Sequence, residues 1–136
     1  MVLNGEKTKV LLAVVERGFD YMAAKHSNLQ LLTPTNNDKI LDADTVSKMS
    51  ACLQFKDLAS VIPVDADFVR GMNPDDFDMI HDLLSSLIRN LRKQMDVNYE
   101  LDPDLANIVN GFFEERIMFL TDIQDDLQAM LEQPDA

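Results

Sequence analysis

The hydrophobic positions of the last third of the chain recur every three or four residues from Leu105 to Leu131, which is the spacing of an α-helix. Asp102 can cap this helix and Pro103 suits its first position, so the pattern predicts a helix over 103–133. At about 1.5 Å per residue it forms a rod of roughly 45 Å. Its apolar positions cover an arc of about 180°, wider than the roughly 100° stripe of an ordinary surface helix. We therefore expect it to touch two neighbours, or one neighbour and another subunit.

Three further segments carry helical patterns. The pattern over residues 5–26 predicts a first helix. Its apolar arc of roughly 220° is also too wide to be covered by one neighbouring helix. Gly18 lies on the inner face of this helix and would let another helix approach closely. Residues 44–62 are helical, as one helix or as two short ones, and residues 64–72 predict a short helical turn with Phe68 tucked in.

A hairpin of two long helices is expected at the C-terminal end. The turn-forming residues of 27–41 predict a loop. Asn73 then caps a helix over 74–95, and residues 96–101 predict a short connection to the helix over 103–133. Because short links favour antiparallel neighbours, we expect the two long helices to form an αα-hairpin.

These elements together predict an all-α fold. We expect a compact antiparallel bundle of four to five helices with a long C-terminal αα-hairpin, in a single helical domain over 1–136. The 136 residues, 46% hydrophobic and 26% charged, agree with one globular domain.

The charge balance narrows the class of partner. The formal net charge is −12, from 24 acidic and 12 basic residues. Such a field repels the phosphates of nucleic acids and the surface of anionic membranes, so direct binding to either is not expected. A protein with a basic surface is the expected partner.

The compartment follows from the cysteine content. Cys52 is the single cysteine, which excludes an internal disulfide and favours the reducing cytoplasm. The apolar run over 10–15 is too short for a signal-peptide core or a membrane span.

Arg116 falls in the middle of the apolar arc of the last helix. Since a guanidinium cannot lose its proton, a buried position requires a carboxylate partner. The hairpin would bring Asp78 or Asp82 close to it, so Arg116, Asp78 and Asp82 are the candidates for buried charges. Two alternatives remain: a fixed cation for an anionic ligand, and a side chain that reaches water past the neighbouring phenylalanines.

Catalytic and metal chemistry find little support. A metal site in a bundle needs converging carboxylates and imidazoles from several helices, whereas one Asp78-x-x-His81 pair occurs and His26 is the sole other histidine. Cys52 has the pattern of a small core residue, and no glycine-rich phosphate loop is present. We expect no enzyme, no metal and no cofactor.

Methionine, phenylalanine and acid together suggest a docking surface. Met79 and Met118 fall outside the main apolar arcs of their helices, and residues 121–136 contain acidic residues but no Lys or Arg. The candidate partner-binding residues are Met79, Phe113, Met118, Asp122, Asp125 and Asp126. Core packing of the methionines and ordinary solvation of the acidic faces explain the same pattern.

The sequence thus predicts a non-enzymatic protein-binding module of adaptor, chaperone or inhibitor type. It would use an apolar Met and Phe surface rimmed by acid, with a homodimer as a further option. One alternative is an acidic mimic of nucleic acid that blocks a nucleic-acid-binding protein, whose affinity would fall steeply with salt. A second alternative is a metal-binding helical bundle.

Overall fold

The computed structural model describes residues 1–32 and 43–133, with the side chains of 26–32 left out. The described residues form five helices: α1 (Gly5–Leu32), α2 (Ala43–Ala59), α3 (Ala66–Arg70), α4 (Pro74–Leu101) and α5 (Pro103–Glu132). Their β-structure is limited to an isolated antiparallel bridge between Val2 and Asp65. The all-α fold with a long C-terminal αα-hairpin is therefore confirmed.

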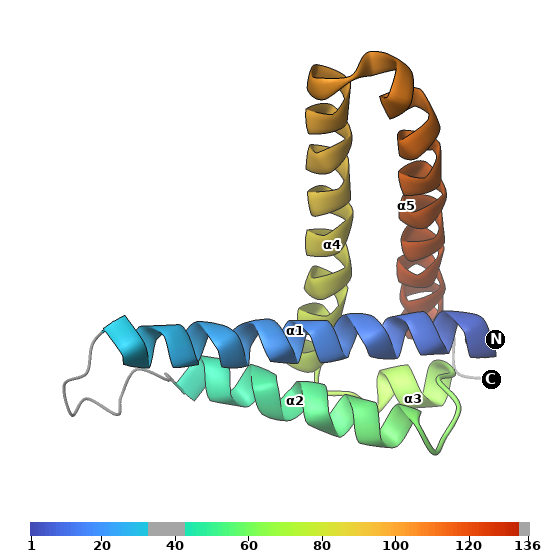
Figure 1. The fold of residues 1–136 in the computed structure, drawn as a ribbon. Helices are drawn as coiled ribbons and strands as arrows, with labels where there is room; N and C mark the ends of the chain where they lie inside the picture. Colours follow the sequence, from blue (N-terminus) through green and yellow to red (C-terminus); the bar gives the residue numbers. More distant parts are fainter. Residues whose placement is uncertain (33–42, 134–136) are drawn as a thin grey trace.

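The helices divide into a platform and a hairpin that stands on it (Figure 1). Helices α1 and α2 lie side by side across the base of the α4–α5 hairpin, and α3 packs beside the C-terminal part of α5. We call α1, α2 and α3 the platform. The last buried side chain of α4 is Ile88, and continuous burial in α5 begins again at Ile117. We call residues 89–116, which extend past the platform, the arm.

Local capping sets where the hairpin helices begin. The side chain of Asn73 accepts a hydrogen bond from the backbone N–H of Asp75 at 2.9 Å, and Pro74 occupies the first turn of α4. The side chain of Asp102 accepts from the N–H of Leu105 at 3.1 Å. Both caps agree with the sequence-based expectation.

The connection expected over 96–101 is wrong, because α4 continues to Leu101. The backbone N–H of Asp102 donates to the carbonyl of Asn98 at 3.0 Å, while its side chain caps α5. One residue therefore ends one helix and begins the next. The free end of the arm is consequently a sharp corner instead of a loop.

Two further expectations concern the end of α1 and the number of helices in 44–62. Helix α1 continues to Leu32, past the break expected at residue 27, while residues 33–42 of that expected loop lie outside the described residues. Helix α2 is a single helix. Its start at Ala43 places Asp44 in the first turn, where it complements the helix dipole.

The hydrophobic core lies where the platform meets the base of the hairpin. All five helices contribute fully enclosed side chains, among them Leu11, Cys52, Val69, Leu84 and Leu120. Gly18 marks the crossing of α1 and α4: a Cβ there would lie 2.7 Å from Cδ2 of Leu83. The close helix approach expected at this glycine is confirmed.

The arm contains a small buried polar network beside partly buried apolar side chains. Asn110 is 1% exposed; its Nδ2 donates to the carbonyl of Met95 at 3.1 Å, and its Oδ1 accepts from Nδ2 of Asn98 at 3.0 Å. Gln94 in turn donates to Asn98. Since a buried amide is costly without partners, this network holds α4 and α5 in one register.

Candidate protein-docking site

The arm exposes an apolar face on α5. Leu105 is 56% exposed, Ile108 65% and Phe112 68%. Their spacing of three and four residues places them on one side of the helix. Across the whole arm, Ala106 and Asn110 are the buried residues. We call Leu105, Ile108 and Phe112 the arm stripe; no element in the described part of the chain covers it.

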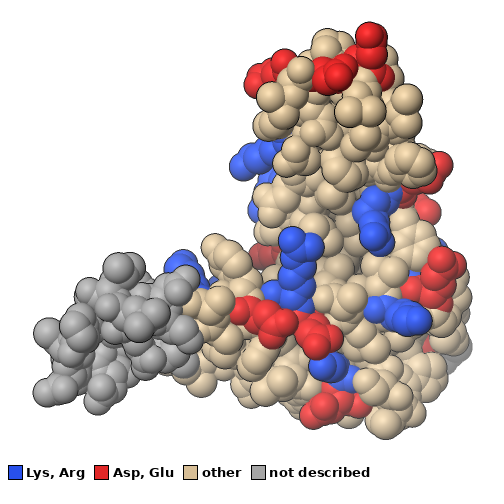
Figure 2. Space-filling model, viewed as in Figure 1, with Lys and Arg blue, Asp and Glu red and all other residues tan. Residues whose placement is uncertain are grey.

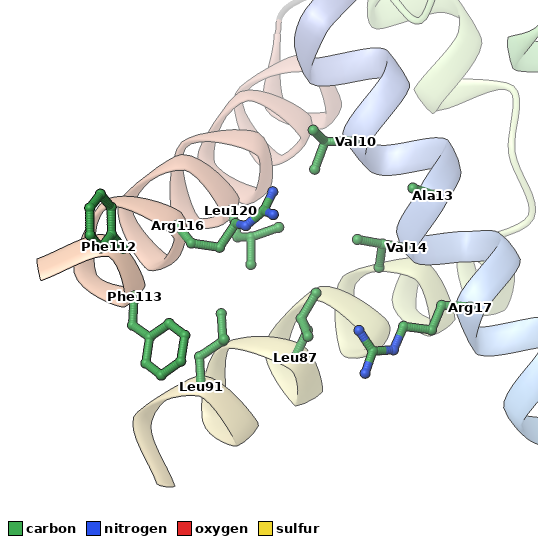
Figure 3. A pocket seen from close by; sticks show the side chains of 10 residues that line it. All are labelled: Val10, Ala13, Val14, Arg17, Leu87, Leu91, Phe112, Phe113, Arg116 and Leu120. Carbon is green, nitrogen blue, oxygen red and sulfur yellow. The ribbon is translucent and has the colours of Figure 1, made fainter. Parts of the chain in front are cut away.

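The stripe leads into a hollow where the arm meets α1 (Figure 3). This hollow has a volume of about 430 Å³, and we call it the elbow pocket. It is lined by Val10, Ala13, Val14, Arg17, Leu87, Leu91, Phe112, Phe113, Arg116 and Leu120. Because Phe112 belongs to both, the stripe and the pocket form one continuous apolar surface.

Two arginines reach over the pocket from opposite sides, Arg17 from α1 and Arg116 from α5 (Figure 3). Both are exposed. Among the side chains that the structure describes, those of 1–25 and 43–133, neither guanidinium has an ion pair or a hydrogen bond. A guanidinium carries five N–H donors and stays charged, so these groups are suited to carboxylates brought by another molecule.

Acidic side chains gather at the free end of the arm, and side chains of both charges lie closer to the platform (Figure 2). Residues 96–104 at its free end hold Asp96, Glu100, Asp102 and Asp104, with no Lys or Arg among them. A second hollow of about 590 Å³, between α1 and α4, is lined by Arg17, Arg89 and Lys93 among others. A chain with a net charge of −12 thus presents acid alone at the free end of the arm, whereas its junction with α1 holds cations together with the exposed Glu16, Glu114 and Glu115.

The expectation of a buried Arg116 paired with Asp78 or Asp82 is wrong. All three side chains are exposed, and no ion pair between them is found in the part of the chain that the structure describes. Helix α1 crosses the hairpin near its base, so no neighbouring helix of the described chain covers the apolar arc of α5 along its full length. At the level of Arg116 the apolar arc faces the elbow pocket instead of a neighbouring helix.

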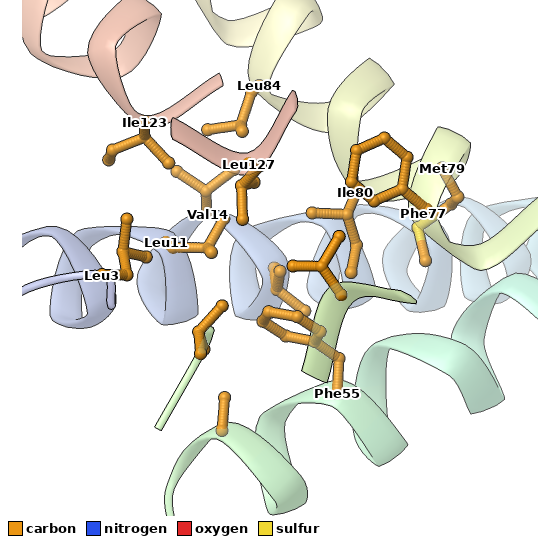
Figure 4. Close-up of a cluster of buried hydrophobic side chains, with 14 of the residues drawn as sticks. Leu3, Leu11, Val14, Phe55, Phe77, Met79, Ile80, Leu84, Ile123 and Leu127 are labelled. Atoms are coloured by element: carbon orange, nitrogen blue, oxygen red, sulfur yellow. The ribbon is translucent and has the colours of Figure 1, made fainter. Parts of the chain in front are cut away.

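Met79 is also misplaced by the sequence pattern, because it lies in the core with 8% of its surface exposed (Figure 4). The thiol Sγ of Cys52 on α2 donates a hydrogen bond to the Sδ of Met79 at 3.7 Å. Helix α2 covers this side of α4, which the periodicity of α4 alone does not indicate. Met79 therefore has no surface to offer a partner, whereas the expected burial of Cys52 is confirmed.

The remaining candidate residues are spread over separate places. Phe113 is half-buried in the elbow pocket. Met118 is 67% exposed, and its helical phase sets it apart from the arm stripe, near the exposed Asp122 and Asp125. These residues do not form one surface.

Asp126 is engaged within the chain. Its carboxylate accepts a hydrogen bond from Nζ of Lys7 at 2.7 Å, and both side chains are largely covered. The hydrogen bond raises the pKa of Lys7, and the charges of Asp126 and Asp122 add to this effect. The acidic segment that lacks its own cations thus receives one from α1.

The residues that sequence reasoning did not single out are Leu105, Ile108, Phe112 and Arg17. The first three were counted in the wide apolar arc of α5, and that width was the available signal for an uncovered face. Arg17 gave no local signal, because it reaches the pocket only when α1 crosses the hairpin.

Other chemistry finds no site in the described residues. They contain no group of three or more His, Cys, Asp or Glu side chains placed to hold a metal ion. Among the described helices, none combines the length and the apolar character needed to cross a membrane. Comparison with protein-family models, with curated proteins and with solved structures gives no match. The mimicry of nucleic acid stays a prediction that none of these observations tests.

Proposed function

We propose that the protein is a non-enzymatic protein-binding module whose docking element is the arm. The observation that carries this proposal is the contrast within α5: Leu105, Ile108 and Phe112 are more than half exposed, while the arm buries little beyond Ala106 and Asn110. A continuous apolar surface that is exposed to water is typical of an interaction site.

The energetics favour a protein partner over a small ligand. Burial of apolar surface contributes about 25 cal/mol per Å², so an open stripe gains most from a long apolar face laid along it. Phe112 stands where the stripe enters the elbow pocket, which is the central position that aromatic anchors occupy in protein interfaces. Charged groups at the two ends then select the orientation of the partner.

The partner's chemistry follows from the charges. It meets acid at the free end of the arm and the guanidinium groups of Arg17 and Arg116 at the elbow. A complementary surface is apolar along its middle, basic at one end and acidic at the other. The basic surface expected from the net charge is therefore needed at only one end of the partner.

Photo-cross-linking in the cells that make the protein tests this proposal. A photoreactive phenylalanine analogue replaces Phe112 in one variant and Met118, equally exposed but away from the stripe, in a matched control. We expect irradiation to give a defined protein adduct from position 112 and much less from 118. More adduct from position 118 than from 112 would overturn the arm and assign docking to the surface around Met118. No adduct from either position would contradict a docking role.

A further inference from the structure

The chain itself carries the partner surface just described. Its own arm is apolar along the stripe, acidic at the free end and bordered by cations at the elbow. We infer that the arm docks on a second copy of this chain, with the two arms antiparallel and the free end of each in the elbow pocket of the other. This inference rests on the proposed docking role of the arm and names the occupant.

The spacing along α5 agrees with a twofold arrangement. Leu105 marks the outer end of the stripe and Leu120 the floor of the elbow pocket, about 22 Å apart along the helix. Phe112 lies midway between them. A twofold axis near Phe112 therefore places Leu105 of each copy over the pocket of the other. Such a contact uses the same patch on both copies and closes as a dimer.

Two arms also complete a structure that one arm leaves unfinished. A pair of helices has one shared seam, and in this arm that seam combines the network around Asn110 with partly buried side chains such as Met95 and Val109. Two antiparallel hairpins form a four-helix arrangement, which encloses an apolar interior between them. The exposed faces of Leu105, Ile108 and Phe112 supply that interior.

The charges select the antiparallel orientation. In this pairing Arg17 and Arg116 of one copy face the carboxylates at the free end of the other. A parallel pairing would set the four carboxylates of each end against their equivalents and leave the arginines without partners. The overall repulsion between two chains of charge −12 is screened beyond about 8 Å at physiological salt, so contacts at the interface decide the outcome.

Charge reversal at the two ends provides the test. The elbow variant carries Arg17→Glu and Arg116→Glu, at two exposed positions without partners among the described residues. The end variant carries Glu100→Lys and Asp104→Lys. A cation is favourable in the last turn of α4 and unfavourable in the first turn of α5, so these two changes offset each other and the fold is retained. Circular dichroism and melting curves verify folding before the mass is measured.

Sedimentation equilibrium then gives the mass of each protein and of their mixture. We expect the parent to be a dimer of 15.4 kDa chains. Each variant alone should dissociate at least about tenfold more readily, because the substitutions remove the attraction between end and elbow and bring like charges into the contact. An equimolar mixture should form a mixed dimer, since the new carboxylates of one variant then face the new lysines of the other. The mixed dimer carries the same total charge as the parent dimer, so bulk repulsion does not account for its recovery.

The contrary results separate the two proposals. A variant that remains a dimer by itself, or a mixture that stays monomeric, overturns the proposal that the free end of each arm lies in the elbow pocket of the other copy. A parent that is monomeric at 100-fold the concentration found in cells overturns the second copy as partner. In that case an adduct between position 112 and a different protein still upholds the docking role of the arm, and its absence removes both proposals.

Discussion

Inside the arm, Nδ2 of Asn98 donates a hydrogen bond to Oδ1 of Asn110 at 3.0 Å. This contact joins α4 and α5 where neither helix contributes a large buried apolar side chain. Apolar side chains tolerate small shifts in register better than paired amides, whose hydrogen bonds need one alignment. The network therefore holds the arm stripe at a defined height above the elbow pocket.

Replacement of Asn110 by Ala should lower the free energy of unfolding by about 1–3 kcal/mol, because the carbonyl of Met95 and the amide of Asn98 lose their buried partner. Chemical denaturation measures this change. Asn107→Ala, at an exposed position of the same helix, serves as the control and should lie within about 0.5 kcal/mol of the parent. Equal midpoints for both variants would show that the network contributes nothing.

Two glycines in helices should respond differently to alanine. Gly111 has open space around its Cα, so Gly111→Ala should stabilise the protein by up to about 1 kcal/mol through helix propensity. Gly18→Ala should gain less or destabilise, because the new Cβ would lie 2.7 Å from Cδ2 of Leu83. Denaturation midpoints of the two variants test this order. A larger gain at Gly18 than at Gly111 would mean that α1 and α4 do not cross so closely.

The ion pair of Lys7 and Asp126 predicts a defined pH dependence. Since the hydrogen bond raises the native pKa of Lys7 above its ordinary value of 10.5, the stabilisation is complete below pH 10.5 and declines as the pH rises through the native pKa. Lys7→Met should therefore melt below the parent at pH 7–10, with a difference that narrows at higher pH. A difference that persists undiminished at pH 12 would assign the effect of Lys7 to packing of its side chain.

The thiol of Cys52 should be unreactive in the folded protein. Burial, with a smaller effect of Asp76, raises its pKa to about 11, and the nucleophile is the thiolate. At pH 8 a thiol reagent should label Cys52 only after unfolding, whereas Met118→Cys adds an exposed thiol that reacts at once. Rapid labelling of Cys52 in the native parent would place α2 away from α4.

The elements that local chemistry determines were predictable from sequence. The caps at Asn73 and Asp102 depend on side chains and backbone a few residues apart, and Pro74 and Pro103 restrict the chain at the same points. The hairpin follows from these signals together with two long apolar patterns. Gly18 was informative as well, because a glycine on an inner helix face permits the close approach that the structure shows beside Leu83.

The candidate site depended on contacts that local patterns do not contain. Periodicity gives the apolar face of a helix but not the length over which a neighbour covers it, so Arg116 was expected to be buried although it stands at an open pocket. For Met79 the error is the opposite: it was expected at the surface but is buried, because α2 covers a part of α4 outside its main apolar arc. The wide arc of α5 did indicate uncovered apolar surface, and the structure locates it at Leu105, Ile108 and Phe112.

In the proposed dimer, the arm stripe packs against the arm of a second copy around Phe112. Phe112→Cys provides the most direct measurement, because thiols near a twofold axis approach within disulfide distance, and Met118→Cys is the equally exposed control. Under mild oxidation and non-reducing electrophoresis, Phe112→Cys should run as a covalent dimer within minutes while Met118→Cys remains a monomer. Equal cross-linking of the two variants, or none at position 112, would show that the two arms do not pack around Phe112.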